Sequence, residues 1–466
     1  MREYRFLGTF ELATPLLLGA GEPADLADSA VWRHASGAAV VPGTSLAGAF
    51  RAHLERLTGA DCKVAEGPPA RLSGREPACG CRICRLFGNV RPGIDLSAHA
   101  SVLVFLDAVV EGAAVRIVDG VAIDRGRRAA SDARRFDFEE VVPGAQIAVD
   151  VRGSALGEDE IAWVGAAFRA LGSGRIALGG RVAQGFGRLE ARNLSLRWRD
   201  TERPDHLVAA VLEIGDSEAA WPEIVEPFPG QGMEEPGGWE VRFQLLTPTP
   251  STFLVADPLE SVRSGFDRAP RGGVAVPELP ATSLRGGLRS AAERILRTLD
   301  PEAACDPTRS SSCAAREREA ASRSQAFDRC LACRVFGNEK WASWVRLEVR
   351  PIAAGGRGRP FDHVAIDRFT GGASRGRKFD ALAATSAEYD VRLSAQGLPA
   401  ADRSWVTGLV ALALGDLHHG RVPLGHGSAR GHGWFLLKEI PAFPEPLEEG
   451  VRALWRKIGV PFPEVA

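Results

Sequence analysis

Eight cysteines fall into two groups of four, and each group ends on a C-x-x-C spacing. Such a turn places two thiolates for a tetrahedral Zn²⁺ ion, and two more cysteines close the coordination sphere. Because four thiolates leave no position for water, the sequence predicts two structural zinc ions, in insertions at about residues 60–90 and 303–338. The alternative is a set of free or redox-active thiols. The predicted ligands are Cys62, Cys79, Cys81 and Cys84, and then Cys305, Cys313, Cys330 and Cys333.

Two eleven-residue stretches, residues 41–51 and 279–289, share the pattern x-P-x-T-S-L-x-G-x-x-R. Apolar residues recur behind each stretch at helical spacing, so we expect a helix capped by a hydroxyl of the Thr-Ser pair. Free N–H groups and small residues at a helix start suit an anion such as a phosphate backbone. The alternative is a duplicated core helix. The candidate contacts are Ser45, Gly48, Arg51, Ser283, Arg285, Gly286 and Arg289.

Two copies of one unit make up the chain, apart from a linker and a tail. Each copy has, in the same order, a β-rich run, the helix described above, a cysteine insertion, the peptide VAIDR, a second helical segment and a glycine loop. The order β, α, β, β, α, β is that of a ferredoxin-like domain. The sequence therefore predicts an α+β protein in which domains 1–195 and 238–440 are joined by a linker, 196–237, and followed by a tail, 441–466, with one short helix.

Composition limits the classes of function. The chain has 466 residues, 45% of them hydrophobic, and a formal net charge of −2, so contacts with nucleic acid must come from local basic patches. We see no apolar run long enough to cross a bilayer, and therefore expect a cytoplasmic protein without a membrane partner.

Taken together, the helix motif, the C-R-x-F-G-N end of each cysteine insertion, the VAIDR peptide and the closing glycine loop resemble the RAMP superfamily. The resemblance is most specific to the repeated backbone subunits, the group seven Cas proteins, of type III CRISPR–Cas effector complexes. It implies two fused RRM-like domains that act in RNA-guided antiviral defence. The partners would be CRISPR guide RNA, complementary target RNA and other Cas subunits.

The resemblance also implies an endoribonuclease. A thumb hairpin would displace one nucleotide of the guide–target duplex, and a loop acid between the first strand and the first helix would cut the target there with Mg²⁺ or Mn²⁺. In the first copy Asp28 fits best and Asp25 is the alternative. In the second copy Asp267 fits best, while Asp257 and Glu260 lie further back. Loop carboxylates are otherwise common as solvated turn formers.

Basic residues follow both VAIDR peptides and are candidates for phosphate contacts. The glycine loops allow a close approach of backbone to RNA. Phe136 and Phe369 are candidates to wedge against a base or, alternatively, to anchor the hairpin to its own domain. The alternative for the charges is a solvated hairpin. The candidates are Arg125, Arg127, Arg128, Arg134, Arg135, Gly185 and Gly187 in the first copy, and Arg368, Arg375, Arg377, Lys378, Gly431 and Gly433 in the second.

Two other functions compete with target cleavage. One is a purely structural RNA-binding backbone whose carboxylates do no chemistry. The other is a metal-independent guide-processing nuclease of the RAMP type, which would need a histidine as general acid or base. Only the second copy has histidines near its glycine loop: His418, His419, His426 and His432.

Overall fold

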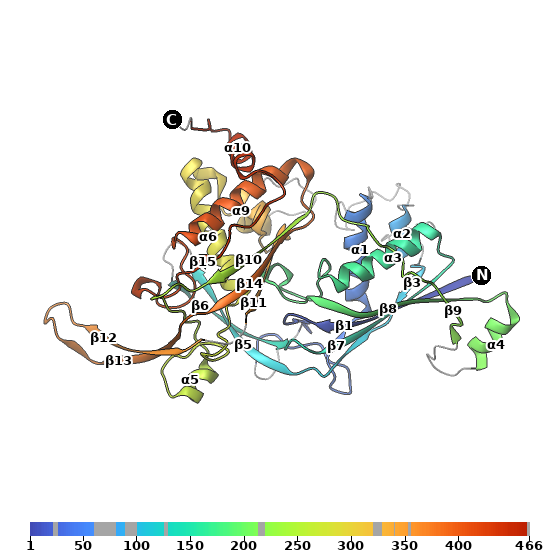
Figure 1. The fold of residues 1–466 in the computed structure, drawn as a ribbon, viewed down its shortest axis with the longest axis horizontal. Coiled ribbons are helices and arrows are strands. Elements are labelled where there is room, and N and C mark those ends of the chain that lie inside the picture. The colour runs from blue at the N-terminus through green and yellow to red at the C-terminus, as the bar shows by residue number, and fades with distance from the viewer. Residues whose placement is uncertain are drawn as a thin grey trace. The chain divides into compact units, whose positions relative to one another are not determined.

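The structure is a computed structural model, and it describes residues 1–21, 27–59, 81–88, 100–124, 129–212, 220–319, 329–339, 341–352 and 356–463. The chain divides between Pro236 and Gly237 into two compact units, which are described separately (Figure 1). None of the helices in these ranges combines the length and the apolarity needed to cross a lipid bilayer.

The first unit is built on β1 (Arg2–Leu12), which pairs antiparallel with β7 (Gln146–Ser154) on one side and β8 (Leu189–Asp200) on the other. The sheet order is β2-β4-β7-β1-β8-β9, and β3 also pairs with β7. Alternate residues of β1 point into the core, as a half-buried strand requires. The remaining strands are β2 (Val40–Val41), β3 (Leu103–Phe105), β4 (Ala108–Glu111) and β9 (Glu223–Ile224).

Helices α1 (Gly43–Thr58) and α3 (Glu158–Gly172) contribute their apolar sides to the core of the first unit. The ring of Phe168 on α3 stacks on Phe6 of β1 at 5.9 Å between centroids and meets Phe50 of α1 edge-on at 5.3 Å. This aromatic cluster fixes both helices on the sheet. The described part of this unit also contains α2 (Arg82–Phe87) and α4 (Pro204–Leu212).

The second unit repeats this plan. Its sheet has the order β11-β14-β10-β15, with β10 (Trp239–Leu246) between β14 (Glu388–Ala395) and β15 (Leu436–Leu437), and β11 (Val345–Pro351) beyond β14. Helices α6 (Ala281–Leu299) and α9 (Arg403–His418) contribute to its core. The other helices are α5 (Pro258–Ser264), α7 (Cys313–Glu319), α8 (Leu331–Phe336) and α10 (Leu447–Ile458).

In both sheets the first strand of the βαββαβ order lies in the centre, flanked by the third and fourth strands. This is the strand order of a ferredoxin-like domain, so the prediction of an α+β protein with two such units in tandem is confirmed. Each unit adds a two-stranded hairpin between its second and third core strands. The hairpins are β5 (Val115–Asp124) with β6 (Ala129–Val141), and β12 (Gly358–Ile366) with β13 (Ala373–Ala384), the latter a long arm in Figure 1.

The expected linker is instead part of the first unit. Strand β8 continues to Asp200, α4 follows, and β9 pairs with β8. The expected tail packs on the second unit, because α10 lies so close to α9 that a Cβ at Gly408 would come within 2.2 Å of the Gly450 carbonyl oxygen. The short helix predicted in that tail is present as α10.

The predicted hydroxyl caps are wrong. Both motif helices begin directly after the proline, with Pro42 and Pro280 at the N-cap and no side-chain cap bond. Proline fixes φ near the helical value, so the helix starts before the Thr-Ser pair, which falls in the first turn. In α1 the free N–H of Gly43 donates instead to Asp107 Oδ1 at 2.7 Å. A carboxylate thus already occupies this helix N-terminus.

Candidate functional site

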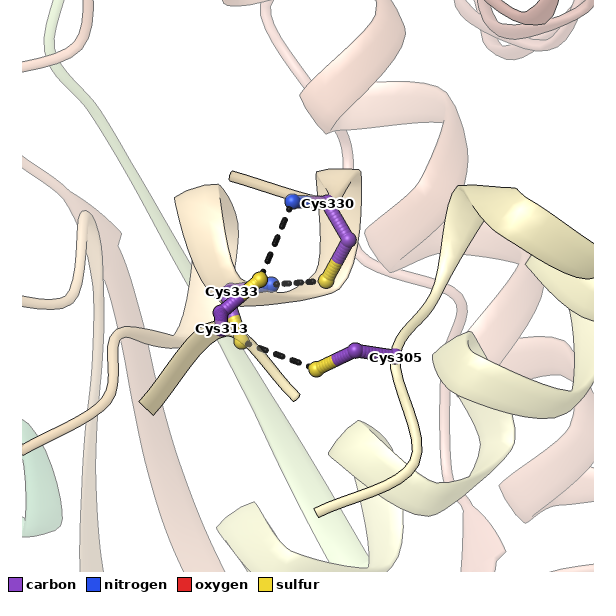
Figure 2. A group of neighbouring side chains, drawn as sticks. All are labelled: Cys305, Cys313, Cys330 and Cys333. Carbon is purple, nitrogen blue, oxygen red and sulfur yellow. Dashed lines mark hydrogen bonds between the residues drawn. The ribbon is translucent and has the colours of Figure 1, made fainter. Parts of the chain in front are cut away.

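The four cysteines of the second unit converge on one point (Figure 2). Their Sγ atoms all lie within 4.8 Å of one another, and those of Cys305 and Cys333 are 3.7 Å apart. A tetrahedral ion with Zn–S bonds of about 2.3 Å requires sulfur separations of about 3.8 Å. The donor set and its spacing therefore fit a structural zinc ion.

Short helices position these thiols. Cys330 is the N-cap of α8, where its Sγ accepts a hydrogen bond from the N–H of Cys333 at 3.4 Å. The N–H of Cys330 in turn donates to Cys313 Sγ at 3.4 Å. Hydrogen bonds from the thiols of Cys305, Cys330 and Cys333 lower the pKa of Cys313 well below its usual range. Hydrogen bonding to neighbouring sulfurs raises the pKa of Cys330 and Cys333, so only a bound cation would let all four ionise.

The first unit has the same cysteine turn. Cys81 is the N-cap of α2 and accepts from the N–H of Cys84 at 3.4 Å, as Cys330 does from Cys333. The two other predicted ligands, Cys62 and Cys79, lie outside the described residues. A zinc ion in the first unit therefore stays a prediction.

The arginine that ends each helix motif contacts the cysteine turn, a contact that the sequence pattern does not predict. Arg289 donates to Cys333 Sγ at 3.4 Å, to the Gly337 carbonyl at 2.8 Å and to Glu293 Oε1 at 2.9 Å. In the first unit Arg51 makes the same three contacts, with Cys84 at 3.5 Å, Gly88 at 3.3 Å and Glu55 at 2.9 Å. Arg285 likewise donates to the carbonyl of Phe336 at the end of α8. These predicted RNA contacts join the motif helix to the cysteine turn.

The small residues of the motif face outward. Gly48 on α1 and Gly286 on α6 are both exposed, and a Cβ at either position would meet nothing within 4 Å. Ser45 is exposed and Ser283 is half-buried. Within the described ranges, no neighbouring group requires glycine at these two positions, although glycine inside a helix costs about 1 kcal/mol relative to alanine. Close approach of an external ligand would explain why both positions are glycine.

Each unit hydrogen-bonds the predicted loop acid to its hairpin. The exposed Asp28 accepts through Oδ2 from the N–H of Asp137 on β6, at 3.0 Å. The exposed Asp267 accepts through Oδ2 from the N–H of Asp380 on β13, at 2.9 Å. Both hairpin residues also have an aspartate opposite them on the partner strand, namely Asp119 and Asp362. The two best-fitting loop acids therefore occupy equivalent places.

The other loop acids differ from these two. Asp257 is the N-cap of α5, accepts from the N–H groups of Leu259 and Glu260, and lies 3.5 Å from Arg271 Nε, so its oxygens serve the fold. Glu260 pairs with Arg263 at 2.8 Å. Asp25 lies outside the described residues.

The hairpin arm of the second unit is exposed. Its basic side chains point to solvent, and Phe369 at the turn is fully exposed. Phe136 of the first unit instead packs against its own unit. Its ring stacks on Phe138, and the guanidinium of Arg181 lies over it at 4.8 Å. Arg135 pairs with Asp119 at 2.8 Å. The exposed residues are Arg368, Arg375, Arg377 and Lys378; the side chains of Arg125, Arg127, Arg128 and Arg134 lie outside the described set.

The glycine loops are held by the fold itself. Gly187 and Gly433 are buried with φ of 75° and 81°, and a Cβ would come within 2 Å of the Leu178 or Leu424 carbonyl oxygen. Both positions therefore require glycine for internal reasons. Gly185 and Gly431 each end a short 3₁₀ turn with φ of 85°; Gly185 is buried and Gly431 is exposed.

The four histidines predicted near the glycine loop of the second unit separate into two pairs. His418 Nδ1 accepts from the N–H of Leu437 at 3.2 Å, and His419 Nδ1 lies 2.7 Å from the Gly415 carbonyl, so both serve the end of α9. His432 is buried, with Nδ1 2.5 Å from Thr252 Oγ1. His426 lies beside it in the glycine loop and contacts two arginines, Arg268 and Arg430.

Comparison with known proteins accounts for the duplicated plan. The model of the RAMP superfamily matches residues 9–190 and again residues 261–436, one region in each unit. Among curated proteins, no match to this chain was found. The two matched regions cover most of the sequence and contain both loop acids, both hairpins and both glycine loops. The chain belongs to the RAMP superfamily, with two copies of its domain in tandem.

Proposed function

We propose that this chain is a backbone subunit of a type III CRISPR effector complex, which binds guide RNA and cuts complementary target RNA through Asp28 and Asp267. Membership of the RAMP superfamily, which is associated with CRISPR–Cas systems, supports an RNA-related role in defence. The observation that carries the finer proposal is the repeated hydrogen bond between each exposed loop acid and its hairpin. The partners would be guide RNA, target RNA and other Cas subunits.

The chemistry follows from an exposed carboxylate held at a hairpin. When a target nucleotide is displaced, its 2′-oxygen can attack the adjacent phosphorus and break the bond to the 5′-oxygen. The loop aspartate would accept the 2′-hydroxyl proton. Asp28 and its neighbour Asp137 are hard oxygen ligands that suit Mg²⁺ or Mn²⁺, and an ion bound there would stabilise the developing charge. A hydrogen bond with Asp119 and the charge of Asp28 raise the pKa of Asp137, as expected for crowded carboxylates.

The basic hairpin arm and the glycine positions of α1 and α6 would bind the RNA. Arg368, Arg375 and Arg377 on the arm are solvent-exposed, and each phosphate that they neutralise adds a salt-dependent increment to affinity. Gly48 and Gly286 leave open space on α1 and α6 into which a sugar–phosphate backbone fits. The cysteine turns, with zinc bound, would hold the middle of both helices through Arg51 and Arg289.

One observation favours a purely structural backbone as the second candidate. The hydrogen bonds to Asp28 and Asp267 tie loop to hairpin, and this is sufficient to explain both residues without any chemistry. The two candidates differ in cleavage alone.

The deciding experiment uses the full chain assembled with guide RNA and a labelled complementary target. Variants Asp28→Asn and Asp267→Asn keep a side-chain oxygen that can accept the hairpin N–H but remove the base. Asp390→Asn, on an exposed position of β14, is the matched control. Loss of cleavage in the first two variants with intact RNA binding supports the nuclease. Full cleavage in the double variant refutes it and leaves the structural backbone.

A further inference from the structure

Two guanidinium groups of the second unit converge on one imidazole. Arg430 Nη2 lies 2.8 Å from Nε2 of His426, and Arg268 Nη1 donates to the same nitrogen. Both guanidinium carbons also lie over the ring of Phe379 on β13, at 5.4 and 5.1 Å from its centroid. Within the described part of the chain, neither arginine pairs with a carboxylate. Four side chains thus form a cationic cluster: Arg268 from a loop, Phe379 from the hairpin, and His426 and Arg430 from the glycine loop.

This arrangement is suited to an anion. Two like charges share one neutral acceptor, and among the described residues neither guanidinium has a carboxylate partner that would offset their repulsion. Burial and the charges of Arg268 and Arg430 lower the pKa of His426 to about 4, so the imidazole stays neutral at pH 7. A phosphate would supply the missing charge, and guanidinium groups bind it through paired N–H donors.

The cluster lies beside the candidate nuclease residue. Arg268 directly follows Asp267, and Phe379 directly precedes Asp380, whose N–H donates to Asp267. His363 on the facing strand β12 stacks on Phe379 at 4.8 Å. A phosphate held by Arg268 and Arg430 would therefore belong to the RNA segment that passes Asp267.

The first unit keeps the aromatic ring but not the two arginines that meet at a histidine. Phe136 takes the place of Phe379, and a single guanidinium, that of Arg181, lies over it at 4.8 Å. When the glycine loops 178–187 and 424–433 are aligned, Gly180 stands for His426 and Gln184 for Arg430. Ser29 follows Asp28 where Arg268 follows Asp267. On the hairpin, Gly120 faces Phe136 where His363 faces Phe379. The two repeats therefore share the loop acid but differ in the groups around it.

We infer that Arg268, Arg430 and His426 form a phosphodiester-binding subsite of the second repeat, adjacent to the position where Asp267 would cut RNA. This inference rests on the proposed function, because it takes RNA as the ligand. The first repeat holds its RNA without such a subsite, so the two repeats differ in how tightly they fix the backbone at the acid.

Binding of guide–target duplex to the full chain as a function of salt tests the subsite. The variant Arg268→Gln/Arg430→Gln should bind about tenfold more weakly, as expected for lost charge-assisted hydrogen bonds. Loss of one phosphate contact should also reduce the salt slope by about 0.7 to 0.9. The control Arg242→Gln/Arg456→Gln removes the same charge from exposed positions on β10 and α10 and should leave both values unchanged. Equal affinity and slope in the test variant and the wild type overturn the inference.

A second measurement compares the wild type with the double variant on modified RNA and identifies the strand. Single neutral methylphosphonate linkages are placed in turn along the guide or along the target. A position at which the neutral linkage weakens wild-type binding about tenfold, but leaves the double variant unaffected, locates the bound phosphate. If no position in either strand behaves in this way, the subsite is refuted. Because both tests report binding, they stand whether or not the target is cut, and absence of cleavage would refute only the nuclease.

Discussion

Asp267 and Asp380 bind each other reciprocally. The N–H of Asp380 donates to Asp267 Oδ2 at 2.9 Å, and the N–H of Asp267 donates to Asp380 Oδ1 at 2.6 Å. The equivalent pair in the first repeat, Asp28 and Asp137, has the first of these bonds at 3.0 Å. In both repeats the loop acid is thus fixed at the hairpin while its side chain remains exposed.

This geometry predicts different outcomes for two substitutions at Asp267. Asp267→Asn keeps an acceptor for the Asp380 N–H, so it should retain thermal stability and RNA affinity while cleavage by this repeat falls at least about 100-fold. Asp267→Ala loses the acceptor as well and should also lower the melting temperature. Cleavage rates, RNA titration and calorimetry of both variants check this. Cleavage by Asp267→Asn at the wild-type rate would show that the carboxylate is not the base.

Replacing the exposed helix glycines with alanine should stabilise the fold but weaken RNA binding. Gly48→Ala and Gly286→Ala place a methyl group in open space and should each stabilise their helix by up to about 1 kcal/mol. If RNA lies against these positions, the same variants should bind it more weakly. Gly415→Ala in α9, which also has open space, is the control that gains stability without losing affinity. Unchanged RNA affinity in both test variants would contradict the helix contact.

The arginine at the cysteine turn should control retention of the metal. Arg289→Lys keeps the charge but loses the geometry that reaches Cys333, Gly337 and Glu293 together. Loss of such an outer contact typically weakens metal binding by about 10- to 100-fold. Transfer of zinc to a chromogenic chelator, measured for Arg289→Lys and for the exposed control Arg309→Lys, gives the comparison. Identical transfer rates would assign Arg289 a purely helix-packing role.

Glu235 should make the first unit sensitive to acid. Its nearly buried carboxylate lies 2.6 Å from His53 Nδ1 and 3.0 Å from Arg56 Nη2. Burial alone would raise its pKa, but the hydrogen bonds from His53 and Arg56 outweigh burial and lower the pKa from 4.5 to about 2. A lowered carboxylate pKa stabilises the fold above pH 4.5, and this contribution, up to about 3 kcal/mol, is lost as the pH falls from 4.5 to 2.

Urea denaturation of Glu235→Gln across that pH range is the check. The variant should be less stable than the wild type at pH 7, and the difference should shrink as the pH approaches 2. Glu234→Gln is the control. Its ion pair with Arg175 is solvent-exposed and therefore contributes little to the free energy of unfolding. A constant difference between wild type and Glu235→Gln at all pH values would contradict the ion-pair account.

The order of elements was predictable because each copy of the unit repeats the same local patterns. The helix starts were not, since Pro42 and Pro280 begin the helices ahead of the hydroxyls that the pattern favoured. The role of Arg51 and Arg289 was missed because their sulfur partners lie more than thirty residues away along the chain. Alignment of the glycine loops would have singled out His426 and Arg430, but nothing in the sequence joined them to Arg268.

The most direct test of the account is a map of cut positions on a target RNA matched to the guide, made with the full chain in its guide complex and Mg²⁺. The account predicts two cuts, one of which disappears in Asp28→Asn and the other in Asp267→Asn, while both variants still bind the target. Two cuts that both persist in the Asp28→Asn/Asp267→Asn double variant would contradict it.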